Sequence, residues 1–140
     1  ALLPIGILFG LAHSGNKDMT TLALVNTIAW GIALGYAFLR SRDLWLPIGM
    51  HYAWNLILVV FGAELSGFTM RVTGLLLKPN PASAWTGGNY GPEGSVLTSV
   101  AVIAVFWILN KAPIERQDSA FAPEPEPPDW DPSSMEGDES

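Results

Sequence analysis

The sequence predicts an all-α protein, namely a polytopic transmembrane helical bundle of about four helical segments with a disordered, acidic, proline-rich C-terminal tail. Hydrophobic residues make up 49% of the 140 residues and charged residues only 14%, and the mean hydropathy is +0.30. Such a composition is too apolar for an ordinary soluble domain. Long stretches carry no charge, and most acidic residues follow them. The composition therefore favours a membrane-embedded body with a separate polar end.

Four apolar runs correspond to the expected helices. The second and third, Met19–Leu39 and Leu44–Ala63, hold 21 and 20 uncharged residues, and the fourth, Gly94–Asn110, holds 17. The first, Ala1–Lys17, resembles the remainder of a span that begins upstream. About 20 residues, at a rise of about 1.5 Å each, cross a hydrocarbon core of roughly 30 Å. In lipid these runs must be helical, because their backbone polar groups have to be satisfied within the segment.

Basic residues near the ends of these runs predict an orientation. Two pairs follow the second and fourth runs and are expected on the cytoplasmic side: Arg40 with Arg42, and Lys111 with Arg116. The opposite side then holds Lys17, Arg71 and Lys78. Trp45 and Trp107, close to the basic ends, fit an interfacial aromatic belt. The expected location is a bacterial-type plasma membrane, crossed several times, with the C-terminal tail in the cytoplasm.

Two glycine pairs have a four-residue spacing that lets helix backbones approach closely. They are Gly6 with Gly10 and Gly31 with Gly35. We expect them to pack helices of one chain together rather than to form a dimer motif. The sequence leaves the oligomeric state open.

The chain divides into a helical domain over residues 1–111 and a tail over residues 112–140. Nine of the thirteen acidic residues lie in residues 113–140, with Arg116 as the single base there. Proline alternates with glutamate from Glu124 to Pro128, so this stretch is expected to be disordered with polyproline character. Residues 78–94 are rich in glycine and proline and predict a loop, with Pro92 in the first turn of the last helix.

Composition also excludes several classes of function. The chain has no cysteine, which excludes disulfide scaffolds, thiolate metal sites and a cysteine nucleophile. The six bases of residues 1–112 are scattered singly rather than laid along one face, so no nucleic-acid partner is expected. Membrane lipid is the expected surrounding.

Few polar residues interrupt the apolar runs, and three of them are candidates for a site. His13 follows Phe9 by four residues, and Asn55 follows His51 by four, so each pair shares one helix face. The first and third helices should run parallel, which allows the two imidazoles to converge inside the bundle. Their depths differ, however, because His13 lies near the far end of its run. Polar groups at such depths are costly and favour a functional role.

Other roles for these groups stay open at this point. Each histidine could instead bond a carbonyl group of a neighbouring helix. Two imidazoles, His13 and His51, could also bind zinc if a metal is used. A third ligand is missing, since Glu64 and Glu93 look like residues at span ends. Three further polar residues are expected to be interhelical hydrogen bonders: Asn26, Thr20 and Thr21.

Two segments resemble motifs of one family. Phe9 to His13 resembles a Phe-x-x-x-His motif, and the segment from Leu44 through Pro47, Ile48 and Gly49 to His51 and Asn55 resembles a His-x-x-x-Asn motif with its lead-in. Both motifs, in this order and one span apart, are found in the CPBP intramembrane proteases. That family includes CAAX prenyl endopeptidases and bacteriocin-processing or self-immunity proteins. The resemblance covers residues 1–63 well and residues 64–110 loosely.

The resemblance implies an endopeptidase that hydrolyses peptide bonds with an activated water. A glutamate of the family's Glu-Glu-x-x-x-Arg motif would activate the water, but that motif is absent from the 140 residues. We therefore expect the C-terminal part of the enzyme, inactive by itself. His51 and Asn55 would stabilise the oxyanion, His13 would position the water or a metal, and Phe9 would contact substrate. The implied substrate is a peptide or protein, prenylated for some members.

A function of another class stays open beside the protease. The chain could belong to a non-catalytic multi-pass membrane protein, such as a transporter or an immunity component. In that case the intramembrane histidines and Asn55 would only pack or gate.

Overall fold

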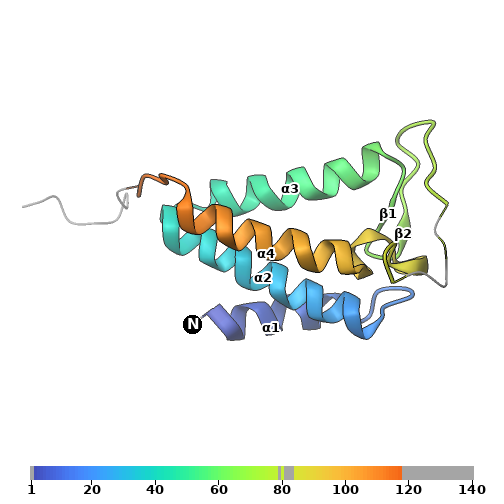
Figure 1. Ribbon diagram of the computed structural model, residues 1–140, viewed down its shortest axis with the longest axis horizontal. Coiled ribbons are helices and arrows are strands. Elements are labelled where there is room, and N and C mark those ends of the chain that lie inside the picture. The colour runs from blue at the N-terminus through green and yellow to red at the C-terminus, as the bar shows by residue number, and fades with distance from the viewer. Residues whose placement is uncertain (1, 79, 81–83, 118–140) are drawn as a thin grey trace, which may run out of the picture.

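Four α-helices dominate the computed structural model, which describes residues 2–78, 80 and 84–117. In chain order they are α1 (Leu2–His13), α2 (Thr21–Ser41), α3 (Trp45–Val60) and α4 (Val96–Lys111). Between α3 and α4 lie strands β1 (Glu64–Leu65) and β2 (Phe68–Thr69) and the 3-10 helices η1 (Gly88–Tyr90) and η2 (Pro92–Gly94). The four predicted helical segments are thus confirmed, and successive helices run in alternating directions along the bundle (Figure 1).

Helix α2 is the centre of the bundle, because it contacts α1, α3 and α4. Its buried residues include Ala33 and Ala37, which are fully buried, and Trp30, which is 8% exposed. Trp30 and Ala33 pack against Val102 of α4, and Phe9 and Trp54 complete this core from α1 and α3. The residues that line a site between these helices are therefore held by one shared core.

The glycine pairs let α1 and α2 approach closely within the chain, as predicted. A Cβ atom added at Gly31 would lie 2.7 Å from Cβ of Phe9 and 3.0 Å from Cα of Gly6. A Cβ atom at Gly10 would collide with the side chain of Ile28. Any larger side chain at these positions would push α1, and Phe9 with it, away from α2.

Hydroxyl side chains cap the N-termini of two helices, α2 and α4. The Thr20 side chain accepts a hydrogen bond from the Ala23 N–H at 3.1 Å, and Ser95 accepts one from the Thr98 N–H at 3.1 Å. The prediction that Pro92 lies in the first turn of the last helix was wrong. Pro92 begins η2, and the chain turns extended at Ser95 before α4 starts.

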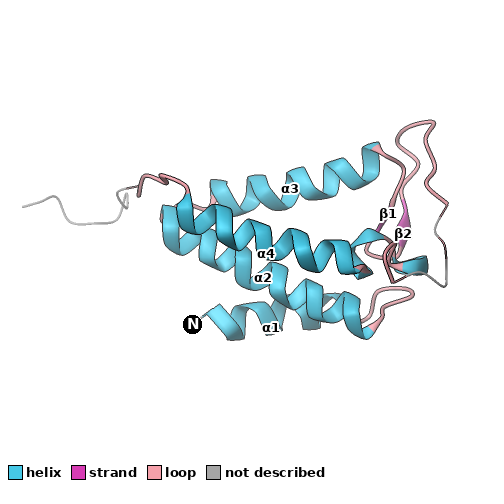
Figure 2. Cartoon of the chain, viewed as in Figure 1, coloured by secondary structure: helices cyan, strands magenta, loops and turns pink. Residues whose placement is uncertain are grey.

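Helix α3 is shorter than its uncharged run because the chain leaves the helix at Phe61, and Gly62 adopts a φ of +69°. The hairpin of β1 and β2 follows, a short antiparallel pair that the sequence did not predict. It closes one end of the bundle (Figure 2). Residues 112–117 are neither helix nor strand, and the rest of the predicted tail, 118–140, lies outside the described residues.

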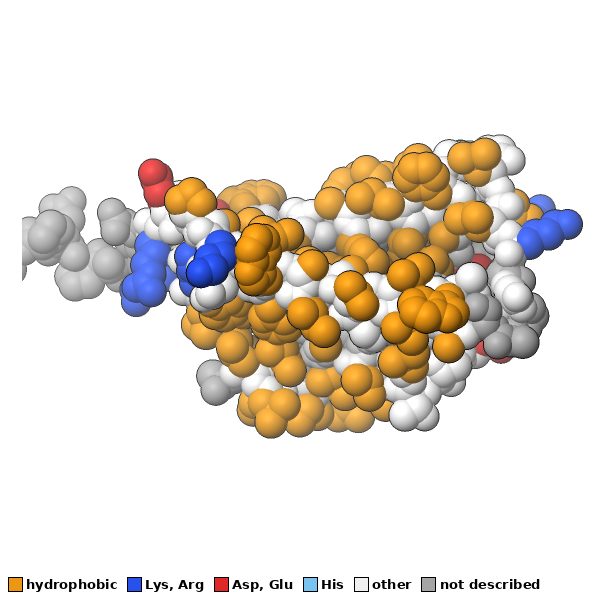
Figure 3. All heavy atoms as spheres, viewed as in Figure 1, with side chains coloured by type: hydrophobic (Ala, Val, Ile, Leu, Met, Phe, Trp, Pro, Cys, Tyr) orange, Lys and Arg blue, Asp and Glu red, His pale blue; other side chains and the backbone are white. Residues whose placement is uncertain are grey.

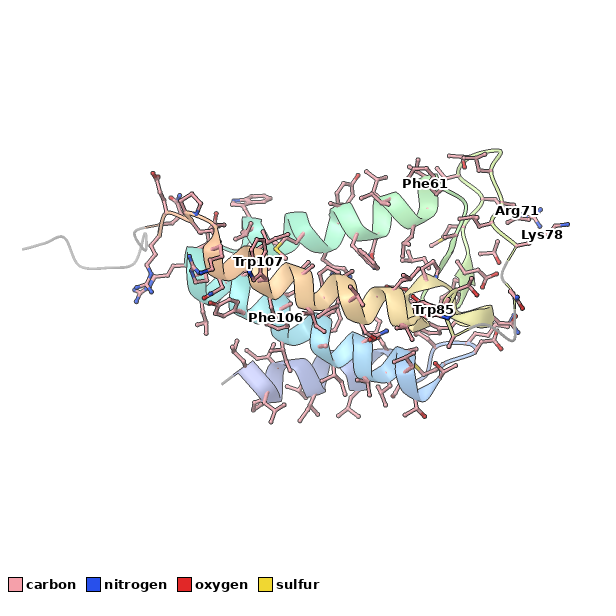
Figure 4. All side chains as sticks on the ribbon, viewed as in Figure 1. Phe61, Arg71, Lys78, Trp85, Phe106 and Trp107 are labelled. Atoms are coloured by element: carbon pink, nitrogen blue, oxygen red, sulfur yellow. The ribbon has the colours of Figure 1, made fainter. Side chains whose placement is uncertain are left out.

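A wide hydrophobic surface covers the helices, and Lys and Arg side chains lie at the two ends (Figure 3). Exposed large apolar side chains include Leu8 of α1, Ile57 of α3 and Ile103 of α4, which are 66%, 54% and 68% exposed. Arg71 and Lys78 lie beyond the end of α3 (Figure 4). Within the part of the chain that the structure describes, α2 is long and apolar enough to cross a membrane, and the other three are shorter apolar helices.

Candidate functional site

A small cavity of about 20 Å³ lies among the three N-terminal helices and the segment before α4, which is about the space that one water molecule needs. Its walls come from Phe9, His13, Thr27, Trp30, Leu34, His51, Trp54, Ser66 and Glu93. The structure thus places His13, His51 and Phe9 around one cavity, although their helices α1 and α3 make their main contacts with α2 rather than with each other.

The Phe9 ring lies against both imidazoles. Its centroid is 4.5 Å from that of His13 and 5.5 Å from that of His51, the second pair meeting edge to face. The aromatic ring therefore restricts the rotation of both histidines and keeps part of their surroundings dry.

The hydrogen bond of His13 determines which of its nitrogens carries a proton. Nδ1 of His13 lies 2.7 Å from the backbone oxygen of Phe9. A carbonyl oxygen only accepts, so Nδ1 must carry the proton and donate it. In the neutral ring Nε2 is then left as an acceptor. His13 can accept a hydrogen bond from water or coordinate a metal through this atom.

Asn55 lies in a neighbouring hollow and does not line the cavity of the two histidines. This open hollow, of about 430 Å³, is lined by His51 and Asn55 with residues such as Leu34, Pro47 and Tyr52. His51 lines both spaces, so its imidazole connects them. The Oδ1 atom of Asn55 is buried and has no hydrogen-bond partner among the described residues. Its carbonyl oxygen is therefore available to accept a hydrogen bond from a ligand.

Glu93 and Ser66 also line the cavity, although no pattern in the sequence predicts them there. Oε2 of Glu93 accepts hydrogen bonds from the Ser66 N–H at 2.5 Å and from the Ser66 hydroxyl at 2.8 Å. From the sequence, Glu93 is interpreted as a residue at a span end. Glu93 belongs to η2, in a segment whose apolar residues have no helical or strand periodicity. Only the path of this segment through the fold brings Glu93 to the histidines.

Asn26 holds this segment in place, which extends its predicted role as an interhelical hydrogen bonder. Its Nδ2 donates to the backbone oxygens of Glu93 at 2.8 Å and Ser95 at 2.9 Å. Its Oδ1 accepts from the Ser99 hydroxyl at 2.8 Å. The carboxamide is buried, with Asn26 only 2% exposed. Thr20 instead begins α2, as its N-cap.

Two further buried donors lie beside the cavity. The indole N–H groups of Trp30 and Trp54 have no hydrogen-bond partner among the described residues, and both tryptophans line the cavity. Buried donors without partners are costly, and a water molecule or a substrate carbonyl group can satisfy them.

A zinc site is not complete in this cavity. Within residues 2–78, 80 and 84–117, no group of three or more His, Cys, Asp or Glu side chains is arranged to hold a metal ion. Catalytic zinc usually takes three protein ligands. His13 and His51 offer two nitrogen donors, one ligand short of that number.

Comparisons with known proteins agree with the arrangement of the two histidine motifs. The comparisons with curated proteins and with solved structures found no match. Residues 1–57 match a family model described as type II CAAX prenyl endopeptidase Rce1-like. That segment contains Phe9, His13, His51 and Asn55, and so both motifs of the intramembrane proteases. Residues 1–57 are therefore similar to the Rce1-like family of type II CAAX prenyl endopeptidases.

Proposed function

We propose that this chain is part of an intramembrane endopeptidase that hydrolyses peptide bonds with an activated water. The observation that carries the proposal is the shared cavity, in which both motif histidines lie around a space for about one water molecule. The Rce1-like match supports the same chemistry.

In the proposed mechanism His13 positions the water. Because Nδ1 of His13 donates to Phe9, its Nε2 accepts a hydrogen bond from the water and orients it. By the family resemblance, a glutamate of the Glu-Glu-x-x-x-Arg motif takes a proton from that water. The water oxygen then attacks the carbonyl carbon of the peptide bond.

His51 and Asn55 are proposed to stabilise the charge that develops on the carbonyl oxygen. They lie one helical turn apart on α3 and line the same hollow. An imidazole N–H and a carboxamide N–H can donate to one oxyanion, and such donors are most effective where water is excluded. Collapse of the intermediate breaks the C–N bond and releases the amine with a proton.

The proposed setting is a membrane that the chain crosses several times. Apolar side chains are exposed on α1, α3 and α4 as well as on α2, and an apolar surface this continuous is rare on soluble monomers. The predicted orientation places the tail in the cytoplasm, with the basic residues after α2 and α4.

The proposed substrate is a peptide or protein, including prenylated proteins as the family description states. A second cavity of about 360 Å³ supports a lipid-modified substrate. Its walls are mainly apolar, with contributions from Leu77, Trp85 and Leu97, and it shares Trp54 with the histidine cavity. An isoprenoid chain would need such an apolar site next to the scissile bond.

A cleavage assay tests the proposal. The full-length protein that contains this chain is assayed in detergent with a quenched fluorescent peptide. His51→Ala and Asn55→Ala are each expected to lower kcat by about 10²- to 10³-fold, because each removes an oxyanion donor. The 140-residue chain alone is expected to be inactive, since it lacks the Glu-Glu-x-x-x-Arg motif.

Asn110→Ala is the matched control for the cleavage assay. Asn110 lies near the end of α4, where its side chain accepts a long hydrogen bond from Tyr36 at 3.4 Å, outside the cavity and the hollow. It should cleave like the unmodified protein. Unchanged cleavage by both His51→Ala and Asn55→Ala would favour a non-catalytic membrane protein instead. Loss of cleavage with a chelator and recovery with zinc would support a metal at His13 and His51.

A further inference from the structure

Glu93 brings a formal charge into the cavity of the two histidines. Among the described residues it is the single carboxylate that lines this cavity, and neither lysine nor arginine lines it. The one ion pair found in the described residues joins Lys17 to Asp18, in the loop between α1 and α2. The Glu93 carboxylate therefore has no cation of this part of the chain to balance it.

The carboxylate is held in a defined position. Ser66 donates two hydrogen bonds to Oε2, one from its backbone and one from its hydroxyl. Ser66 sits in the turn between β1 and β2 with a φ of +50°, so the hairpin itself presents both donors. Oε1 of Glu93 has no hydrogen-bond partner within residues 2–78, 80 and 84–117, and it can accept one from a ligand.

The backbone around Glu93 is fixed as well. The Glu93 carbonyl group accepts from Asn26 at 2.8 Å, and the Pro92 carbonyl group accepts from the Thr98 hydroxyl at 2.6 Å. Helices α2 and α4 thus hold the two ends of this short segment. A charge held this firmly does not need to reorganise when a substrate arrives.

The surroundings strengthen the effect of the charge. Phe9, Trp30, Leu34 and Trp54 form apolar walls of the same cavity. Charges interact more strongly where water and its screening are excluded. The cavity has room for about one water molecule, so the charge acts on a substrate group bound beside it. An acidic group there would be repelled, and a basic or N–H-bearing group would be attracted.

We propose that Glu93 makes the site selective against acidic substrates, so that peptides with a basic or neutral residue beside the scissile bond are cleaved in preference to those with Asp or Glu. This inference rests on the proposed endopeptidase function. It concerns which peptides are accepted, and discrimination of this kind commonly uses a repulsive charge.

The test compares two peptides that differ only by Lys or Asp next to the scissile bond. For the full-length protein we expect kcat/KM for the Lys peptide to exceed that for the Asp peptide by roughly 100-fold. Glu93→Gln keeps the size of the side chain and an oxygen for the Ser66 donors, and it should reduce this ratio to below about 10. A general loss of folding would lower both values and leave the ratio unchanged, so the ratio separates the two effects.

Glu115→Gln is the control, because Glu115 is exposed in the segment after α4 and lines neither of the two cavities nor the hollow of Asn55. Its Lys-to-Asp ratio should equal that of the unmodified protein. An unchanged ratio in a Glu93→Gln protein that still cleaves the Lys peptide at the rate of the unmodified protein would overturn the inference, while cleavage itself still supported the protease. Binding of the two labelled peptides to the His51→Ala protein, measured by fluorescence anisotropy, gives the same comparison without catalysis. If the His51→Ala protein binds the Lys and Asp peptides equally, or binds neither peptide, the inference is also overturned.

Discussion

The Asn26 carboxamide both donates and accepts hydrogen bonds. The amide group donates to two backbone oxygens ahead of α4, and the carbonyl oxygen accepts from Ser99. An asparagine in the middle of an apolar helix is costly unless such partners are present. Here the partners belong to the segment that carries Glu93. The residue therefore connects the stability of the bundle to the geometry of the cavity.

Asn26→Ala is expected to lower the free energy of unfolding by about 1–3 kcal/mol, because it leaves the Glu93 carbonyl group without its donor and removes the short acceptor of the Ser99 hydroxyl. SDS titration in mixed micelles, followed by tryptophan fluorescence, measures this change. Asn16→Ala removes the same side chain from the half-buried loop between α1 and α2 and should have little effect. An equal decrease in the free energy of unfolding of the two variants would mean that the hydrogen bonds of Asn26 do not stabilise the protein.

At the scale of helices, the site depends on how closely α1 lies against α2. Gly31 faces Gly6 and Phe9 across this contact. Phe9 in turn lies against both imidazoles. The separation of two helix backbones therefore controls the positions of His13 and His51, although neither histidine touches the glycines.

Gly31→Ala is expected to destabilise the protein by about 1–3 kcal/mol and to lower the rate of cleavage, because the added Cβ displaces Phe9. Gly49→Ala is the matched control in α3, two residues before His51. A Cβ atom at Gly49 meets nothing within 4 Å, so this variant should gain about 0.5–1 kcal/mol from its better helix propensity. Unfolding in SDS and the peptide assay give both quantities. Equal stability of the two variants would contradict the close approach of α1 and α2.

The sequence was sufficient for some elements and not for others. The four helices follow from long uncharged runs, whose helical character is a physical requirement of an apolar surrounding. The pairing of His51 with Asn55 follows from helical spacing. Glu93 could not be placed, because it lies beyond a long irregular segment whose path depends on tertiary hydrogen bonds to Ser66 and Asn26. The sequence also did not predict where α3 ends. The uncharged run continues past Val60, and the positive φ at Gly62 does not change the pattern of apolar residues.

For the molecule as a whole, the hydrophobic surface lies between two ends that carry basic side chains (Figure 3). Arg40 lies close to Arg42 at the end of α2. Its guanidinium donates hydrogen bonds to the backbone oxygens of Leu109 at 2.6 Å and Ala112 at 3.0 Å. The ends of α2 and α4 therefore lie at one level. Arg71 and Lys78 lie at the other end of the molecule (Figure 4).

The absence of cysteine from the sequence makes this orientation simple to test. Arg42→Cys and Lys78→Cys, each the single cysteine in its protein, are expected to react with a membrane-impermeant maleimide from opposite sides of the membrane. Arg42→Cys should be labelled only after the cells are opened, and Lys78→Cys in intact cells, because basic loops are retained in the cytoplasm. Labelling of both from one side would contradict the proposed topology.

The hydrogen bonds between α2 and the region of α4 show which part of the chain the family-matched segment depends on. Residues 1–57 carry the Rce1-like match, but α4 lies beyond them. Without α4 and the Ser95 that caps it, Asn26 would lose the Ser95 carbonyl group and Arg40 the Leu109 carbonyl group as hydrogen-bond acceptors. The segment that matches the family model therefore relies on a helix outside the match to satisfy two of its polar side chains.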